Sequence, residues 1–337
     1  MRFRSEESAG ERKETPMNEI VRIDIHTHAG GVLYPEAPLE ELVGTMQRGG
    51  MHAACFAIVP DAPLLSFTDK GHITVDTSVG MDDILSYTER AFAKLNSLIE
   101  RQGFLRIRTT NDLWNAAMSG VPGAICAIEG ADHLQGDLAQ LDRDFHDRDV
   151  RQLGLVHYRV NEIGDIQTEP ELHGGLTAFG RDVVRRCNEI GIIVDLAHAS
   201  VKTAQQVIDC ARAPLVCSHT SLASSGDANP RLLEHETAKR IASTGGLIGV
   251  WPNKDIFPTA EHYFSGIARL ADLVGVDCVA IGTDTGGVRN SVFCRYEDTN
   301  TIVDGLVEFR FSREEAAKIA GLNYVRVLDM VTWHAAS

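Results

Sequence analysis

The sequence has few positive charges for its length and no long run of apolar residues. Its 32 Lys and Arg residues are outnumbered by 47 Asp and Glu residues, which leaves a formal net charge of −15. A surface of this sign repels nucleic-acid phosphates and anionic membranes, so we predict no nucleic-acid partner. Residues 1–20 lack the apolar core of a secretory signal, and no later segment is apolar for long enough to cross a bilayer. We therefore expect a soluble chain without a membrane anchor.

Cysteines are too few and too scattered to suggest a disulfide framework. There are seven of them, an odd number, and most lie inside apolar runs, where a thiol behaves as a small buried hydrophobe. This usage fits a reducing compartment, and we predict a cytoplasmic location. Nucleotide-binding glycine loops are also missing, because no phosphate-loop motif is present and Gly286-Gly287 lacks the spacing of a dinucleotide site. No organic cofactor is implied.

Linkers and repeats are missing as well, which favours a single domain. No Gly/Ser/Pro-rich segment, low-complexity tract or internal repeat divides the chain. The first residues are charged and have no hydrophobic periodicity, so we predict a disordered tail over residues 1–20. We expect one catalytic domain over residues 21–337, since 44% hydrophobic residues can fill a large core.

What the sequence does have is an alternation of short apolar runs and amphipathic stretches. Eight runs are almost continuously apolar, as strands are when both faces of a parallel sheet are covered. They are residues 21–26, 53–59, 123–129, 151–158, 190–198, 214–219, 245–251 and 278–284. Helices are predicted over residues 38–49, 80–102, 176–191 and 312–328. Ser312 and Glu315 are placed for a capping box at the start of the last helix. This order predicts an α/β fold, the (β/α)₈ TIM barrel of metal-dependent hydrolases.

Residues of the types that bind metals stand at the ends of five predicted strands. His26 and His28 end the first strand, and because side chains alternate along a strand, they point the same way and can hold one ion. Four further strands end in Glu129, His198, His219 and Asp284. Each residue has a simpler explanation when taken alone, such as a buried ion pair or a core histidine. However, the carboxyl ends of barrel strands converge on one face, so the ordered set predicts a metal site.

Two other residues are candidates for substrate contact. His157 ends the fourth predicted strand and either faces the substrate or is a core or supporting histidine. Arg231 either binds a substrate carboxylate through its planar guanidinium or begins a surface helix. Asp24 and Asp195 precede ligand positions, and we expect them to support the site rather than to bind metal. The longest irregular stretches, residues 60–79, 160–175, 221–229 and 286–301, each follow a strand, where barrel enzymes place substrate-binding loops.

At these positions the sequence resembles the membrane (renal) dipeptidases, peptidase family M19 of the amidohydrolase superfamily. The resemblance rests on Asp24–His28, Ala127–Gly130, residues 174–200, Pro214–Ser221, Asn229–Arg231 and Gly282–Gly287, which follow the family's order. It implies a centre of two divalent metal ions, expected to be zinc. Glu129 corresponds to the bridging carboxylate, His26 to a ligand of the first ion, and His198 and His219 to ligands of the second.

The resemblance also implies an activity and a set of roles. The activity is hydrolysis of the amide bond of small L,L or L,D dipeptides by a hydroxide that bridges the metal ions. His157 corresponds to the histidine that contacts the scissile carbonyl, and Arg231 to the arginine that contacts the substrate. Asp284 corresponds to the aspartate of strand eight, and our hypothesis is that it carries the proton from the nucleophile to the leaving amine.

The sequence departs from the family at one ligand position. The first motif of the family usually reads H-x-D, whereas the second ligand position here is His28. A neutral ligand in place of a carboxylate raises the net charge of the first metal site, which changes metal preference or the acidity of bound water. Two alternatives therefore stay open, namely an amidohydrolase of the same superfamily that acts on another small amide or a lactone, and a non-catalytic homologue. A homodimer is also left open.

Overall fold

The computed structural model describes residues 20–67, 73–76, 78–224, 226–227, 229–288 and 290–336. In these residues the central sheet has nine strands, eight of which are hydrogen-bonded in chain order. The eight are β1 (Ile23–Thr27), β2 (Ala53–Ile58), β6 (Gly123–Ile128), β7 (Val150–Gly154), β8 (Ile193–Asp195), β9 (Val216–Thr220), β10 (Leu247–Val250) and β11 (Val279–Ile281). Each pairs with its neighbour in parallel, and the ninth strand, β5 (Leu105–Arg106), pairs with β6. Nearly all of the predicted tail lies outside the described residues.

The last strand meets the first, which nearly closes the sheet into a barrel. The backbone N–H of Asp284 donates to the carbonyl of His26 at 3.0 Å, and the N–H of His28 donates to the carbonyl of Thr285 at 2.8 Å. The buried Asp24 carboxylate reinforces this junction, because it accepts hydrogen bonds from the backbone and the hydroxyl of Thr283. The predicted α/β barrel is confirmed, and three of the predicted metal ligands, His26, His28 and Asp284, lie at its closure.

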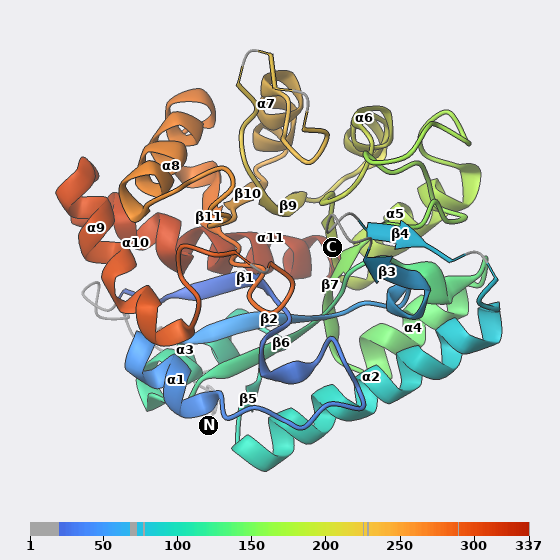
Figure 1. The fold of residues 1–337 in the computed structure, drawn as a ribbon, viewed down its shortest axis with the longest axis horizontal. Helices are drawn as coiled ribbons and strands as arrows, with labels where there is room; N and C mark the ends of the chain where they lie inside the picture. Colours follow the sequence, from blue (N-terminus) through green and yellow to red (C-terminus); the bar gives the residue numbers. More distant parts are fainter. Residues whose placement is uncertain are drawn as a thin grey trace, which may run out of the picture.

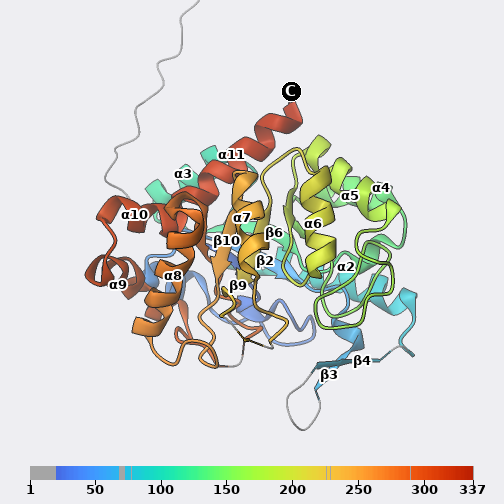
Figure 2. The same cartoon turned by 90° about the horizontal axis from the view of Figure 1, so that it is seen from above.

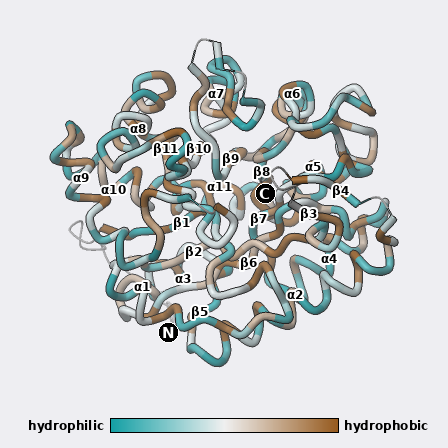
Figure 3. Tube along the Cα trace, in the orientation of Figure 1, coloured by the Kyte–Doolittle hydropathy of each residue, from teal (hydrophilic) through white to brown (hydrophobic). Residues whose placement is uncertain are grey.

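Helices surround the barrel (Figures 1 and 2). They are α1 (Val43–Gly49), α2 (Met81–Gln102), α3 (Thr110–Ser119), α4 (Leu138–Asp147), α5 (Ala178–Ile190), α6 (Val201–Cys210), α7 (His235–Ser243), α8 (Ala260–Val274), α9 (Ile302–Phe309), α10 (Arg313–Ala317) and α11 (Asn323–Ala336). Hydrophobic and hydrophilic segments alternate along them in Figure 3, as expected of helices with one buried face. No helix among the described residues is long and apolar enough to cross a membrane.

Helix α11 closes the end of the barrel that lies opposite the strands' carboxyl ends. The hydroxyl of its Tyr324 donates to Gln152 of β7 at 3.1 Å inside the barrel. Just before α11, residues Lys318–Leu322 form a wide helical turn that interrupts the single helix predicted over residues 312–328. The turn brings Gly321 against β1 so closely that a Cβ there would lie 2.4 Å from the Val21 carbonyl oxygen. Figure 2 shows α11 and the β3–β4 hairpin on opposite sides of the molecule.

Two further predicted segments differ from the structure, the first because of a contact distant in sequence and the second because of a local pairing of short strands. The helix predicted over residues 38–49 begins only at Val43. The Gln102 side chain of α2 accepts the N–H groups of Leu42 and Val43 at 2.8 and 3.2 Å and so acts as its cap. The stretch of residues 60–79, predicted to be irregular, contains an antiparallel hairpin of β3 (Leu65–Phe67) and β4 (Ile73–Val75). Residues 68–72 and 77 of that stretch lie outside the described residues.

Candidate active site

The barrel brings all six predicted metal-ligand residues together at the carboxyl ends of its strands. His26 and His28 lie at the end of β1, Glu129 follows β6, His198 follows β8, His219 lies in β9 and Asp284 follows β11. All six are buried, and the most accessible of them, Asp284, is only 8% exposed. Such a concentration of buried imidazoles and carboxylates is costly to fold unless a cation or a network of hydrogen bonds compensates it.

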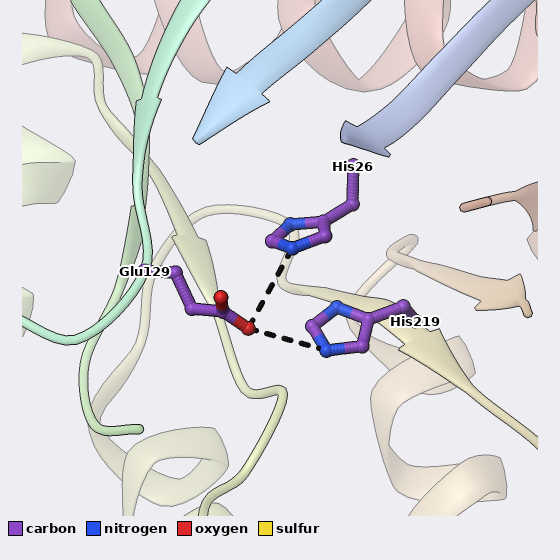
Figure 4. A group of neighbouring side chains, drawn as sticks. All are labelled: His26, Glu129 and His219. Carbon is purple, nitrogen blue, oxygen red and sulfur yellow. Dashed lines mark ion pairs between the residues drawn. The ribbon is translucent and has the colours of Figure 1, made fainter. Parts of the chain in front are cut away.

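Glu129 stands at the centre of this cluster. Its Oε1 lies 2.8 Å from His198 Nε2, 3.2 Å from His219 Nε2 and 3.5 Å from His26 Nε2. Figure 4 shows the His26 and His219 rings directed at this one carboxylate. The other oxygen, Oε2, lies 3.1 Å from His28 Nε2. The two carboxylate oxygens therefore face different imidazoles, as a carboxylate between two cations would.

The remaining contacts divide the histidines into two pairs. His26 Nε2 and His28 Nε2 lie 3.3 Å apart, and Asp284 Oδ1 lies 3.4 Å from His28 Nε2. His198 Nε2 and His219 Nε2 lie 3.1 Å apart, and both share Glu129 Oε1 with His26 Nε2. The donor atoms of His26, His28 and Asp284 fall within 4.8 Å of one another, as do those of His26, Glu129 and His219.

The hydrogen bonds of His28 test whether a metal ion fits. Its Nδ1 lies 2.8 Å from the Ala57 carbonyl oxygen, which can only accept a hydrogen bond, so Nδ1 carries the proton. In the form of the ring that can bind a metal ion, Nε2 directs a lone pair at Glu129 and Asp284. Lone pairs that face one another repel unless a cation lies between them. A buried set of imidazole nitrogens and carboxylate oxygens is the donor chemistry of a zinc-type ion, so the residues fit such a metal.

The local backbone also shows that this site is under constraint. His198 and Asp284 adopt left-handed conformations, with φ of 67° and 51°, although neither is glycine. Such residues carry strain that the surrounding fold must offset, and they cluster at functional sites. After Asp284 the backbone passes so close to His28 and to the Asp284 side chain that two positions have room only for glycine. A Cβ on Gly286 would lie 2.9 Å from the His28 carbonyl group, and a Cβ on Gly287 would lie 2.2 Å from Asp284 Oδ1.

His157 reaches the same cluster from β7 and is held by a residue that sequence reasoning missed. Its Nε2 lies 3.5 Å from Glu129 Oε2, and its Nδ1 lies 2.7 Å from Asp61 Oδ1. The other Asp61 oxygen accepts the N–H groups of Tyr158 and Arg159 at 3.1 and 3.2 Å. Asp61 is fully buried in the loop after β2. In the sequence, Asp61 could have been noticed only as an acidic residue soon after an apolar strand. That pattern is too common to identify Asp61 as a site residue.

Arg231 lies in the same cavity as the metal-ligand cluster and His157. Its guanidinium carbon stacks 5.2 Å above the Trp251 ring, and its Nη1 donates to Gln167 Oε1 at 3.3 Å. The Nε atom of Arg231 is buried and has no hydrogen-bond partner among the described residues. The guanidinium group of Arg231 therefore lies in the cavity wall, and not at the start of a surface helix. Gln167 and Trp251, which hold it, were not predicted from the sequence.

Asp24 and Asp195 form hydrogen bonds next to the ligand positions. Asp24 Oδ1 accepts the His26 N–H at 3.2 Å and so fixes the backbone of a ligand residue. Asp195 Oδ1 accepts the Ser218 N–H at 2.9 Å, next to His219, and its Oδ2 accepts Gln152 Nε2 at 3.1 Å. Neither belongs to a group of described residues that could hold a metal ion.

Burial and close charges shift the pKa values of the cluster in opposite directions. Burial alone would lower the pKa of His26, but the carboxylates of Glu129 and Asp284 raise it to about 9. Burial would raise the pKa of Glu129, but His157 and His26 hold it well below its usual range. Burial raises the pKa of Asp284. Nearby imidazoles therefore favour the anionic form of Glu129, whereas burial favours the protonated form of Asp284.

The parallel barrel and its buried cluster of ligand-type residues define the class of metal-dependent hydrolases. Within this class the chain belongs to the membrane dipeptidase family, peptidase family M19, whose family model matches residues 36–337. This confirms the predicted family and supports a hydrolase enzyme that depends on metal. The matched range begins after His26 and His28, so the unusual first motif lies outside it.

Named relatives and solved structures agree with this membership. Dipeptidase verJ of Clonostachys rogersoniana is 28% identical over 293 residues, which cover 84% of this chain and 73% of that protein. Dipeptidase tcpJ of Claviceps purpurea is 32% identical over 237 residues, which cover 67% of this chain and 55% of that protein. The chain thus spans between about half and three quarters of these relatives. A metallopeptidase from Rhodobacter sphaeroides has the same fold, with a TM-score of 0.78, 20% identity, and coverage of 93% of this chain and 100% of that chain.

Proposed function

We propose that this chain is a dipeptidase whose single catalytic domain, residues 21–337, hydrolyses the amide bond of small L,L or L,D dipeptides. The observation that carries the proposal is the position of Glu129 between two pairs of histidines, in one cavity with Arg231. The relatives named above are dipeptidases, and the Rhodobacter sphaeroides structure is liganded with a phosphinate mimic of the dipeptide L-Ala-D-Ala. A carboxylate-binding arginine beside a metal centre suits such substrates.

Six residues would hold two divalent ions, which we expect to be zinc. His26, His28 and Asp284 would hold the first ion and His198 and His219 the second, with Glu129 between them. When bound, the ions would supply Lewis-acid activation of a water molecule and of the amide carbonyl. Two of the imidazole rings are held independently of metal, since His28 Nδ1 donates to the Ala57 carbonyl and Ser218 Oγ lies 2.9 Å from His219 Nδ1.

The other residues would bind the substrate and move its protons. Arg231 would hold the terminal carboxylate. Burial would lower the pKa of His157, but Asp61 and Glu129 raise it to about 9, so the ring carries a proton on both nitrogens at neutral pH. Its Nδ1–H donates to Asp61, and its Nε2–H would donate a hydrogen bond to the amide oxygen as negative charge develops there. Asp284 would take the proton from the attacking water and give it to the departing amine. His157 would thus act on the carbonyl side of the scissile bond and Asp284 on the amine side.

The proposed function is tested with a panel of substrates. We expect L-Ala-L-Ala and L-Ala-D-Ala to be hydrolysed, and their C-terminal amides to have a kcat/KM about 10- to 100-fold lower, because a charge-assisted hydrogen bond to Arg231 is lost. Arg231→Ala should remove this difference, whereas Arg185→Ala, at an exposed position of α5, should keep it. Hydrolysis of lactones or N-acyl amino acids without any hydrolysis of dipeptides would contradict the proposal. It would favour the alternative that His28 keeps open, another amidohydrolase of the superfamily.

We expect Asp61→Asn to lower kcat about 10- to 100-fold with little change in KM. Asn keeps the shape of Asp61 and an acceptor oxygen, but it loses the negative charge that favours a proton on His157. The measurement is steady-state kinetics on L-Ala-D-Ala, with metal content and the thermal midpoint recorded in parallel. Asp182→Asn, which removes an exposed charge on α5, serves as the control. An unchanged kcat in a folded, metal-loaded Asp61→Asn protein would exclude this positioning role.

A further inference from the structure

We infer that the cavity selects dipeptides with an apolar side chain on the N-terminal residue. This inference rests on the proposed function. The cavity that contains Glu129, His157 and Arg231 is also lined by Leu33, Val59, Ala62, Leu65 and Ile73, which we call the apolar wall. All five side chains are aliphatic, and all except Val59 are partly exposed. Exposed aliphatic surface inside a polar catalytic cavity indicates a binding surface for an apolar group.

The order of the strands places the apolar wall across the barrel from Arg231. Val59 and Ala62 directly follow β2, and Leu65 and Ile73 belong to the β3–β4 hairpin that comes next. Arg231 follows β9. In the eight-strand order, β2 is second and β9 is sixth, so the two strands stand on opposite sides of the barrel. The metal-ligand cluster occupies the floor between them.

This arrangement sets the direction in which a dipeptide lies. A substrate with its carboxylate on Arg231 and its amide bond over Glu129 must extend its N-terminal residue toward β2. The side chain of that residue then meets the apolar wall. The C-terminal residue stays on the β9 side and makes no contact with the wall, so the wall selects for the first residue of the substrate only.

The charges of the cavity exclude the other classes of side chain. Among the described residues that line the cavity, the only carboxylates are Glu129 and Asp284, both assigned to metal, and the only guanidinium or ammonium group is that of Arg231. A charged N-terminal side chain would therefore lose water at the wall without gaining a partner of opposite charge. An aliphatic or aromatic side chain loses nothing there and buries apolar surface.

The experiment measures kcat/KM for dipeptides X-Ala in which only the first residue changes. We expect Leu-Ala and Phe-Ala to exceed Gly-Ala by about tenfold or more, since even one methylene in an apolar pocket changes kcat/KM by about that factor. Asp-Ala and Lys-Ala should be the poorest substrates. Equal kcat/KM for all five dipeptides would overturn the inference while leaving the proposed function intact.

Substitutions in the apolar wall test whether it causes the preference for an apolar N-terminal side chain. Leu65→Asp should lower the ratio of Leu-Ala to Gly-Ala hydrolysis about tenfold and raise Lys-Ala relative to Leu-Ala, because it places a carboxylate in the wall. Leu172→Asp makes the same chemical change at a position that is 73% exposed and does not line the cavity, and it should keep the native ratios. Ile73→Asp repeats the test on the neighbouring strand. Native ratios in both wall variants would overturn the assignment, whereas a native protein that hydrolyses no dipeptide would overturn the proposed function itself.

Discussion

Asp284→Asn is expected to lower kcat about 10³-fold while the protein stays folded, because a positioned general base contributes factors of about 10² to 10⁴. Asn has the shape of Asp but cannot accept a proton at neutral pH. Asp284 adopts a left-handed conformation, with φ of 51°, and Asn is one of the few residues that tolerate this backbone. The effect should therefore come from the chemistry of the side chain rather than from misfolding.

The measurement compares kcat, KM and metal content of the Asp284→Asn variant with those of the native protein. Asp304→Asn is the matched control, since it makes the same substitution at an exposed position of α9. Loss of kcat with both metal ions retained would agree with a proton-transfer role, whereas loss of the first ion would show that Asp284 acts as a metal ligand. A variant that keeps near-native kcat would show that another group moves the proton.

Glu129→Gln has the second large expected effect, which is loss of bound metal together with activity. Among the described residues, Glu129 is the one whose oxygens face both pairs of histidines, at 2.8 Å from His198 and 3.1 Å from His28. A neutral amide lacks the negative charge that holds two cations together, and its NH₂ group would donate hydrogen bonds to the imidazoles instead. We expect less than one bound metal ion per chain. We also expect kcat to be at least about 10³-fold lower, because a central electrostatic group of the site is removed.

Metal analysis of the purified Glu129→Gln protein, with kcat measured on the same sample, checks this prediction. Glu314→Gln, on the exposed face of α10, provides the control for loss of a carboxylate. Full metal content in the Glu129→Gln variant would contradict the assignment of Glu129 as the residue that bridges the two metal ions.

The parts of the fold that depend on local pattern were predictable from the sequence. A strand covered on both faces must be apolar throughout, so segments such as residues 53–59 and 123–129 predict buried parallel strands without knowledge of their partners. The same logic located the ligand residues, because a polar group directly after such a strand has few positions available. His198, shortly after β8, and His219, near the end of β9, were located in this way and lie 3.1 Å apart.

The parts that depend on contacts between distant segments were not predictable. Asp61 reaches His157 across 96 positions of sequence, and the loop that carries it has no periodicity to interpret. Gln102 caps α1 across 60 positions, which shortened the predicted helix. The hairpin of β3 and β4 was missed for a different, local reason, since strands of three residues are too short to show an alternating pattern. Its pairing, which includes a 2.8 Å contact between the Ser66 and Thr74 hydroxyls, is visible only in the structure.

The central claim is that two cations held around Glu129 are required for hydrolysis, and a titration of metal-free protein tests it most directly. The chain is stripped with a chelator, shown by metal analysis to be free of metal, and then titrated with Zn²⁺ while hydrolysis of L-Ala-D-Ala is measured. We predict no activity at the start and recovery that reaches its plateau at about two equivalents of metal per chain, as a site of two ions requires. Hydrolysis at the native rate by the verified metal-free protein would contradict this account.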